Sequence, residues 1–231
     1  MRFGIHLPQY GRAASAEAIT AAARRAEELG FADVWVSDHI VHPAEQSYPS
    51  PFLLDPFVTL TWAAAVTQRV RLGTSVLVVP QHNPVWLANH LATLDAMSSG
   101  RLVLGAGVGW SKREYDALAQ SFETRGARLD EILDLLRVAW RDDPVSFSGE
   151  FYELADIRFL PKPAHDIQIW IGGGVEAAFK RAIVRATAST SSASSRPRWS
   201  PSSSVCDAIA RSRRSPSRLA RVGIRRAWTR S

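Results

Sequence analysis

Polar residues and glycines follow several apolar segments of this sequence, at the points where each segment ends. If these segments are parallel strands, their carboxyl ends meet at one edge of a sheet, where parallel α/β folds bind their ligands. We therefore expect the candidate site at that edge. The residues placed there are Ser37-Asp38-His39, Gly73-Thr74-Ser75, Gly105-Ala106-Gly107-Val108-Gly109-Trp110 and Gly172-Gly173-Gly174.

His39 is the candidate for proton chemistry, because imidazole titrates near neutrality and the carboxylate of Asp38 can fix its tautomer. A structural histidine with satisfied hydrogen bonds is the competing interpretation. His39 and His42 do not predict a metal site, since Pro43 argues against a helix there and no cluster of carboxylates and histidines accompanies them. His82 and His90 are interpreted as a loop residue and a helix-surface residue with no identified partner.

Two glycine motifs have a functional and a conformational interpretation. Gly172-Gly173-Gly174 lie between a strand and a helix, where free backbone N–H groups and the helix dipole favour a phosphate, although a tight turn needing positive φ is the alternative. Gly105, Gly107 and Gly109 have G-x-G-x-G spacing, one residue short of the dinucleotide fingerprint, which disfavours a classical NAD fold. We expect them to let a flat ring approach the backbone closely.

The hydrophobic periodicity predicts alternating strands and helices. Apolar residues at helical spacing follow Ser15, which can cap a helix that ends near Gly30. Buried strands separated by amphipathic helices indicate a parallel sheet covered by helices. The predicted strands are 2–7, 33–37, 70–79, 101–107 and 167–171, and the predicted later helices lie near 55–67, 84–98, 124–140 and 175–186, giving five βα units.

Two segments depart from this alternation of strands and helices. Residues 141–166 are rich in aromatic and proline signals and predict an inserted hairpin or extended excursion. The helix before them carries Arg125, Arg128, Asp130 and Glu131, which we interpret as a solvated, salt-bridged face. Residues 187–231 contain thirteen Ser, ten Arg and one acid, a net charge of +9, and have too few large apolar residues to form a core.

The charge distribution limits the classes of partner. The whole chain has a net charge of +6, but residues 1–186 carry 18 basic and 21 acidic residues, a net of −3. An RNA-binding protein would have to act through the Ser/Arg tail, whose aromatic residues are Trp199 and Trp228, so no nucleic-acid partner is predicted. No apolar run reaches the ~18 residues that span a bilayer, and Cys206 is the single cysteine, so we expect a cytoplasmic protein without membrane attachment or disulfides.

Several segments taken together resemble the luciferase-like monooxygenase superfamily, especially its coenzyme F420-dependent oxidoreductases. The resemblance covers about residues 1–186. It rests on FGIHLPQYG, AARRAEELGFADVWVSDH, VRLGTSVLVVPQHNPVWLANHLATLDAMSSGRLVLGAGVGW followed by Glu114-Tyr115, RLDEIL, and FLPKPAHDIQIWIGGG.

The resemblance implies a (β/α)8 TIM barrel that binds F420, or alternatively FMN, at the carboxyl ends of its strands and transfers a hydride to or from a small organic substrate. His39 matches the active-site histidine, with Asp38 beside it. Thr74 and Ser75 match a strand position whose backbone, often bulged with a non-prolyl cis peptide, supports the ring. The remaining matches are the pocket edge, Gly107, Val108, Gly109 and Trp110, and a phosphate-binding turn, Gly172, Gly173 and Gly174. Such relatives are often homodimers.

The chain departs from the family pattern after Ala186. Where relatives continue with three more βα units, this sequence has Thr187-Ala188-Ser189-Thr190 and the basic tail. Reading the codons two bases later permits Asp-Gly-Phe-His, which resembles the missing family segment. We therefore hypothesise one partial barrel domain, 1–186, followed by an out-of-frame translation, 187–231.

Three functions stay open on the sequence alone. The first is an F420-dependent oxidoreductase, and the second is an FMN-dependent monooxygenase that uses a partner reductase. The third is an inactive, truncated remnant of such an enzyme, because a barrel with five of eight strands leaves open sheet edges.

Overall fold

The computed structural model describes residues 2–46 and 50–186. The predictions of a basic tail and of an altered reading frame fall on residues 187–231, which lie outside the described residues.

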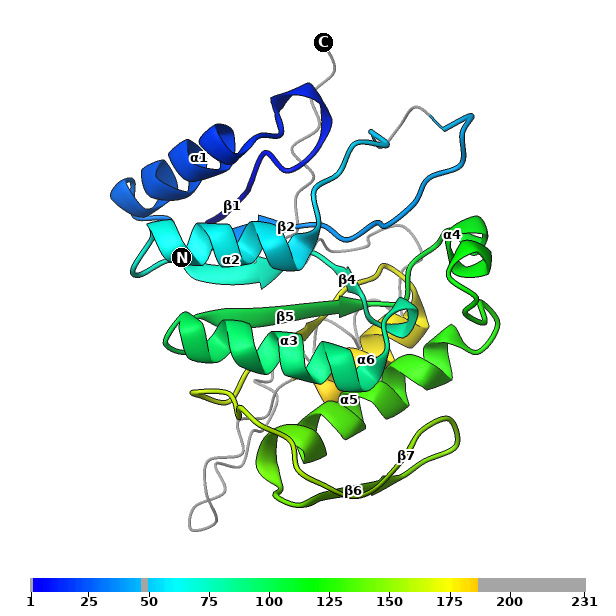
Figure 1. Ribbon diagram of the computed structural model, residues 1–231. Helices are drawn as coiled ribbons and strands as arrows, with labels where there is room; N and C mark the ends of the chain where they lie inside the picture. Colours follow the sequence, from blue (N-terminus) through cyan, green and yellow to red (C-terminus); the bar gives the residue numbers. More distant parts are fainter. Residues whose placement is uncertain (1, 47–49, 187–231) are drawn as a thin grey trace, which may run out of the picture. The chain divides into compact units, whose positions relative to one another are not determined.

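Five βα units follow one another along the described chain, which confirms the alternation that the periodicity predicted (Figure 1). Two short 3₁₀ turns, Gly11–Ala13 and Val79–Gln81, join strand to helix within the first and third units. The units are β1 Gly4–His6 with α1 Ala16–Glu28, β2 Asp33–Val36 with α2 Pro56–Val66, β3 Arg71–Thr74 and β4 Leu77–Val78 with α3 Pro84–Met97, β5 Leu102–Gly107 with α4 Lys112–Ala117 and α5 Arg125–Arg141, and β8 Gln168–Ile171 with α6 Glu176–Arg185.

Side-chain caps set the starts of the first three helices. The Ser15 hydroxyl accepts a hydrogen bond from the Ala18 N–H at 3.1 Å, as predicted. Asp55 caps α2 through the Val58 N–H at 2.8 Å, and Asn83 caps α3 through the Val85 N–H at 3.0 Å. Each cap satisfies a backbone donor that the first helical turn leaves free, which is worth about 1 kcal/mol. Gly30 has a φ of +77°, the left-handed conformation that ends α1.

The main sheet is parallel in every pairing. Its strands run in the order β1, β2, β3 and β5, with β8 on the far side of β5. Within the described residues, β1 and β8 are each paired along one side only. The part of the sheet that the structure describes therefore has two open edges, and Phe3 at the β1 edge is 60% exposed.

One predicted strand, 70–79, is wrong as a continuous element. From Leu72 to Leu77 the chain advances five residues, whereas their partners Leu102 and Ala106 on β5 are four apart. The extra residue interrupts the strand between β3 and β4, as a bulge does. The Ser75–Val76 peptide in this interruption is cis, which is the bulged cis geometry that the resemblance implied.

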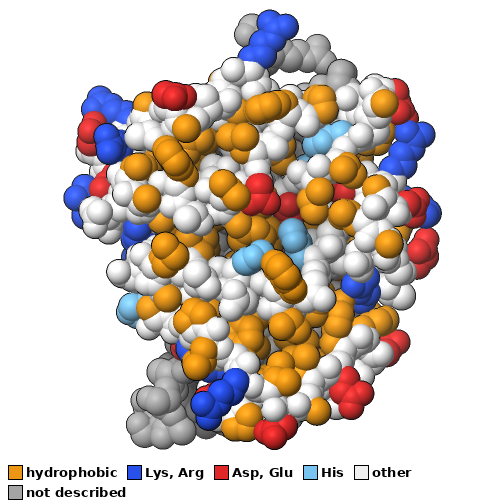
Figure 2. Space-filling view, viewed as in Figure 1, with side chains coloured by type: hydrophobic (Ala, Val, Ile, Leu, Met, Phe, Trp, Pro, Cys, Tyr) orange, Lys and Arg blue, Asp and Glu red, His pale blue; other side chains and the backbone are white. Residues whose placement is uncertain are grey.

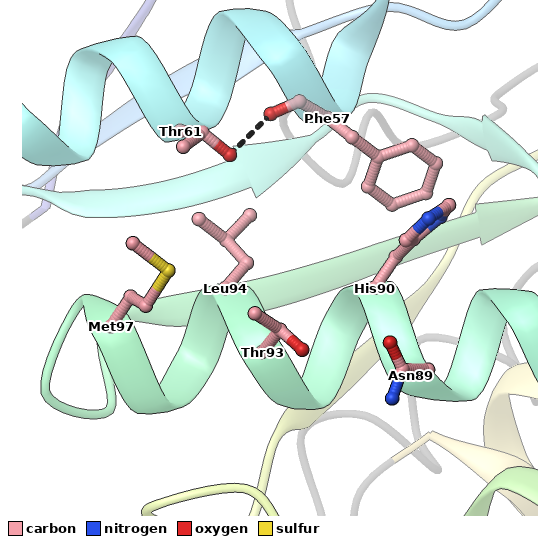
Figure 3. Close-up of a pocket in the computed structure, with 7 residues that line it drawn as sticks. All are labelled: Phe57, Thr61, Asn89, His90, Thr93, Leu94 and Met97. Carbon is pink, nitrogen blue, oxygen red and sulfur yellow. Dashed lines mark hydrogen bonds between the residues drawn. The ribbon is translucent and has the colours of Figure 1, made fainter. Parts of the chain in front are cut away.

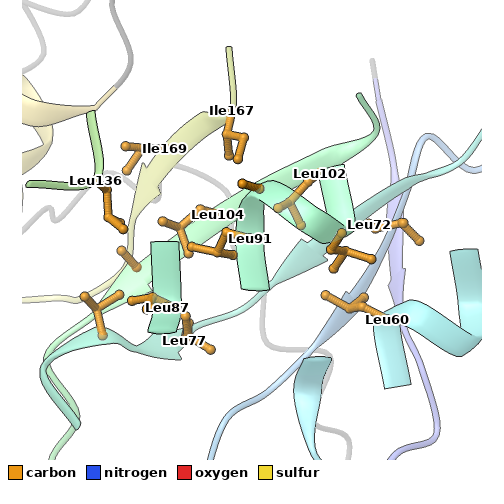
Figure 4. Packing of buried hydrophobic residues seen from close by; sticks show 14 of the residues in the cluster. Leu60, Leu72, Leu77, Leu87, Leu91, Leu102, Leu104, Leu136, Ile167 and Ile169 are labelled. Carbon is orange, nitrogen blue, oxygen red and sulfur yellow. The ribbon is translucent and has the colours of Figure 1, made fainter. Parts of the chain in front are cut away.

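The hydrophobic core lies between the sheet and its helices (Figure 4). Alternate strand residues such as Leu72, Leu104 and Ile169 face helix residues such as Leu91 and Leu136, and all are buried. Full burial of each leucine contributes about 1.5–3 kcal/mol of transfer free energy. The opposite face of the sheet carries Trp35, which packs on Trp170 with ring centroids 5.2 Å apart.

The predicted hairpin in 141–166 is confirmed as the antiparallel pair β6 Val145–Ser148 and β7 Glu153–Ile157. The predicted face on α5 is half-buried instead of solvated, although Asp130 is salt-bridged as predicted. The Glu131 carboxylate accepts hydrogen bonds from the hairpin N–H groups of Glu150, Phe151 and Tyr152, and Asp130 pairs with Arg181 of α6 at 2.6 Å. This face therefore holds the hairpin and α6 in place.

No helix among the described residues is long and apolar enough to cross a membrane.

Candidate functional site

The predicted site residues of three strands come together at the carboxyl edge of the sheet. His39 follows β2, the interruption between β3 and β4 carries Ser75, and Trp110 follows β5. The His39 ring meets the edge of the Trp110 ring, with centroids 5.8 Å apart. Trp110 is 58% exposed, so one wall of this site faces solvent.

A buried carboxylate, Glu114, holds His39. One Glu114 oxygen lies 3.0 Å from Nδ1 of His39, and the other accepts the Ile40 N–H at 2.7 Å. Burial raises the pKa of Glu114, but the hydrogen bonds from His39 and Ile40 and the His39 charge outweigh it, so the pKa lies below its ordinary value. An ionised carboxylate accepts hydrogen bonds only, so Nδ1 of His39 carries a proton. Its Nε2 has no hydrogen-bond partner within the described residues and can serve a ligand.

A second carboxylate and histidine pair lies directly beside the first. The Asp38 Oδ2 accepts the Val78 N–H at 2.9 Å and a hydrogen bond from His82 Nε2 at 2.7 Å. Asp38 is 2% exposed, and its Oδ1 is buried without a hydrogen-bond partner in the described part of the chain. The pair links the end of β2 to β4 and the 3₁₀ turn after it.

His82 is a loop residue, as predicted, but the expectation that it has no partner is wrong. Its partner Asp38 is 44 residues away in sequence, and nothing local indicates the pairing. His90, by contrast, lies on the exposed surface of α3, as predicted.

The glycines of β5 are required by neighbouring protein groups. A Cβ at Gly105 would lie 1.9 Å from the Thr74 carbonyl oxygen, and one at Gly107 would lie 2.5 Å from Val76 Cγ2. Thr74 is buried, and its hydroxyl donates to the Gly105 carbonyl at 2.9 Å and accepts the Gly105 N–H at 3.0 Å. The close approach that we expected of a flat ring is made at these two positions by Thr74 and Val76.

The rest of the β5 segment supports α4. Gly109 has a φ of +68°, which a glycine adopts readily, and the Val108 carbonyl accepts the Tyr115 hydroxyl at 2.6 Å. Burial raises the pKa of Tyr115, so this hydroxyl stays protonated as a donor. The contact anchors α4, which carries Glu114 to His39.

The triple glycine forms the turn between β8 and α6. The Gly172 N–H donates to the Ala106 carbonyl at 2.8 Å, and a Cβ there would lie 2.2 Å from Val76 Cγ1. Gly173 has a φ of +140°, and nothing lies within 4 Å of a Cβ built at Gly174. Gly172 thus permits packing on Val76, and Gly173 adopts a positive φ and lies close to Ala178, whose Cβ would be 2.8 Å from an added Cβ. Open space for a ligand is found at Gly174.

Glu114 and His82 are the site residues that sequence reasoning missed. Ser111 and Glu114 have the S-x-x-E spacing of a capping box, which could have predicted α4. The Ser111 hydroxyl does accept the Glu114 N–H at 3.3 Å, but the glutamate side chain binds His39 instead of closing the box.

A shallow groove lies elsewhere, between α2 and α3, with a volume of about 150 Å³ (Figure 3). His90 and Phe57 point toward each other at one end of it, with ring centroids 5.2 Å apart. Trp62 of α2 and Trp86 of α3 are also exposed. Hydrophobic side chains are spread over the face of the molecule shown in Figure 2. No predicted site residue lines this groove.

The chain is similar to known oxidoreductases. The F420-dependent glucose-6-phosphate dehydrogenase of Amycolatopsis mediterranei is 36% identical over 157 residues, which are 65% of this chain and 45% of the relative. The solved monooxygenase RslO1 from Streptomyces bottropensis is 32% identical, with a TM-score of 0.63, over 74% of this chain and 53% of that one. A solved F420-dependent secondary alcohol dehydrogenase is 28% identical, with a TM-score of 0.62, over 75% and 53%.

The chain thus spans about half the length of these relatives. Structural neighbours of its described part are TIM-barrel enzymes of the luciferase-like type. The model of the luciferase-like monooxygenase family matches residues 1–221, and the chain belongs to this family.

Proposed function

We propose that the site serves an oxidoreductase that uses coenzyme F420 to transfer a hydride to or from a small organic substrate. The observation that carries the proposal is the His39–Glu114 pair, which leaves His39 Nε2 open at the carboxyl edge of the sheet. The F420 dependence of relatives that are 36% and 28% identical supports the choice of cofactor.

The residues present fit a deazaflavin cofactor. The ring would lie beside His39 and the Ser75 backbone, and Trp110 would cover its edge. Asp38 would steady the His39 segment through its hydrogen bonds to Val78 and His82. When bound, F420 would supply the hydride chemistry, while the protein would supply orientation and a protected site.

Gly173 and Gly174 would receive the phosphate of the cofactor through their exposed backbone. The opening turn of α6 also contains Glu176, whose carboxylate pairs with Lys180 at 2.9 Å. An acid in the first helical turn competes with an anionic ligand there. Phosphate binding at this turn would therefore depend on the backbone N–H groups of Gly173 and Gly174, and on the ion pair in which Lys180 offsets the charge of Glu176.

The proton chemistry belongs to His39. With Nδ1 held by Glu114, a neutral ring presents the Nε2 lone pair and a protonated ring presents an Nε2–H donor. His39 can therefore accept or donate one proton at a fixed point without turning. The expected small-molecule substrate would lie next to it.

Two alternative functions are also proposed. An FMN-dependent monooxygenase with a partner reductase is the alternative enzyme, and the likeness to the monooxygenase RslO1 favours it. The edges that β1 and β8 leave unpaired among residues 2–46 and 50–186 favour the other, an inactive remnant whose reading frame changes after Ala186. The homodimer implied by the resemblance stays a prediction.

One titration separates these proposals. The 231-residue chain is titrated with F420 and with FMN while cofactor fluorescence is followed, beside a version whose reading frame is restored after Ala186. Preferential quenching of F420 by the 231-residue chain supports the leading proposal, and preference for FMN supports the alternative enzyme. Binding by the restored version alone supports the remnant. If neither version binds either cofactor, the proposed function is wrong.

A further inference from the structure

Gln81 is a buried polar residue beside both carboxylate and histidine pairs, and it belongs to neither. It ends the 3₁₀ turn Val79–Gln81, so Val78 and His82 flank this turn in the chain. Both flanking residues bind Oδ2 of Asp38, the Val78 N–H at 2.9 Å and the His82 Nε2 at 2.7 Å. The Asp38 carboxylate therefore spans the turn that carries Gln81.

The side-chain amide of Gln81 is shielded from solvent and lacks a regular hydrogen bond. Gln81 is 5% exposed, and its Oε1 and Nε2 atoms are buried without a hydrogen bond of ordinary geometry to any described residue. Oδ1 of Asp38, on the carboxylate that spans the same turn, is also buried without a partner in the described chain. Buried polar groups are costly without a partner, so these two groups call for one.

The Glu114 carboxylate has one hydrogen-bond position left for Gln81. An ionised carboxylate accepts about four hydrogen bonds, two on each oxygen. Its Oε1 accepts the N–H groups of Ile40 at 2.7 Å and Val41 at 3.4 Å, and its Oε2 lies 3.0 Å from His39 Nδ1. Among the described residues, the second position on Oε2 is therefore open.

The Gln81 amide lies close enough to Glu114 to act on its charge. Burial raises the pKa of Glu114, whereas hydrogen bonds from His39, Ile40 and Gln81 lower it, and the lowering prevails. An amide lowers the pKa of a carboxyl group by donating to its ionised form. The NH₂ group of Gln81 therefore faces Glu114.

A water molecule matches the groups that remain. Oδ1 of an ionised Asp38 can only accept, whereas Gln81 keeps a second N–H donor and the acceptor Oε1 after it donates to Glu114. The Asp38 and Gln81 side chains make no direct hydrogen bond. Water both donates and accepts, and a buried water makes about three hydrogen bonds to polar groups of this kind. One water would therefore satisfy both side chains.

We propose that Gln81 is a positioning residue that joins the two carboxylate and histidine pairs into one network, by donating to Glu114 directly and to Asp38 through one buried water molecule. The network connects the segment after β2 to the turn after β4 and to α4. Gln81 thereby holds the carboxylate that holds Nδ1 of His39, so the His39 Nε2 atom keeps one direction. The effect on turnover rests on the proposed function, whereas the network itself does not.

The first test looks for the buried water by NMR of the full chain labelled with ¹⁵N. The side-chain NH₂ signals of Gln81 are assigned as the pair that Gln81→Met removes. In paired NOESY and ROESY spectra, we expect a contact between these protons and water with the negative NOE of a long-lived buried molecule. The side chain of Gln68, which is exposed, provides the comparison with surface water. The same weak or positive NOE at Gln81 as at Gln68 overturns the inference.

The second test measures the pKa of Glu114 from its ¹³C carboxyl shift. Gln81→Met keeps a side chain of similar size that cannot donate, so the Glu114 pKa should rise above its wild-type value. Gln81→Glu keeps the shape but adds a second carboxylate, so the rise should be larger. Gln68→Met should leave the Glu114 pKa unchanged. A Glu114 pKa that neither change at Gln81 raises overturns the inference.

The other titratable and charged groups around Glu114 and its neighbour on α4 stay the same in all these variants, so a difference in the Glu114 pKa reports Gln81. These groups are His39, His42, Asp38, His82, Tyr115 and Arg125.

The third test distinguishes this inference from the proposed function. F420 should bind wild type and Gln81→Met with the same Kd, while turnover falls ~10-fold in Gln81→Met because His39 is held less firmly. Failure of wild type to bind F420 contradicts the proposed function, and the two NMR tests still decide the network. Normal F420 binding with undiminished turnover in Gln81→Met contradicts the positioning role alone.

Discussion

The buried carboxylate of Glu114 lies 3.0 Å from Nδ1 of His39, although 75 residues separate them. The same carboxylate accepts the Ile40 N–H, so it fixes both the ring and the backbone that follows it. The arrangement gives His39 one defined tautomer at the carboxyl edge of the sheet.

Glu114→Gln should abolish this control. The Gln oxygen can replace one carboxylate oxygen, but its NH₂ group must face either the Ile40 N–H or the protonated Nδ1. We expect His39 to shift toward the Nε2–H tautomer and cofactor-dependent turnover to fall ~100-fold or more. Histidine ¹⁵N shifts and turnover measure these effects. Glu123→Gln, at an exposed position, is the matched control, and equal behaviour of the two variants would contradict the role of Glu114.

The βα units could be predicted because their signals are local. Ile19, Ala23 and Ala26 recur at helical spacing and are buried on α1, and Ser15 caps that helix. Periodicity alone could not predict the break between β3 and β4, since apolar residues run through most of VRLGTSVLVV, and only the resemblance implied a bulged cis peptide there. Its position depends on the register against β5.

The candidate site could be predicted only in part for the same reason. The position of His39 after a buried strand is visible in the sequence, whereas its partner Glu114 lies on α4, two βα units later in the chain. The pair Asp38 and His82 is likewise tertiary. Periodicity indicates where strands end, but it does not indicate which charged side chains meet there.

Stability should depend on pH through Glu114. Its folded pKa lies below the unfolded value of 4.5, so the unfolded chain binds more protons between the two values. The stabilisation of the fold by the ionised Glu114 carboxylate is therefore complete above about pH 4.5, and it is lost as the pH falls through the folded pKa of Glu114. Urea unfolding from pH 3 to 7, in ~1-unit steps, should show a smaller pH dependence for Glu114→Gln than for wild type. If the free energy of unfolding depends on pH equally in wild type and Glu114→Gln, the role of Glu114 in this pH dependence is refuted.

His82→Ala should destabilise the fold although His82 is partly exposed. The change leaves the buried Asp38 carboxylate with the Val78 N–H as its remaining hydrogen bond among the described residues. Loss of a hydrogen bond to a buried group costs about 1–3 kcal/mol. Thermal unfolding measures the cost, and His90→Ala on α3 is the control, for which we expect a change within about 0.5 kcal/mol. A similar melting temperature for the two variants would contradict a structural role of the pair.

Gly172→Ala tests whether this glycine serves packing. The new methyl group would meet Val76 Cγ1 at 2.2 Å, so we expect a loss of about 1–3 kcal/mol from overpacking. Val76→Ala in the same chain should restore part of that loss, because the nearest remaining side-chain atom, Val76 Cβ, lies at an ordinary 3.5 Å. Gly174→Ala, with open space around its Cβ, should be nearly neutral. Urea unfolding of wild type, Gly172→Ala, Val76→Ala and the double variant gives the coupling energy. Additive effects of the two single changes would show that the two side chains do not compete for one space.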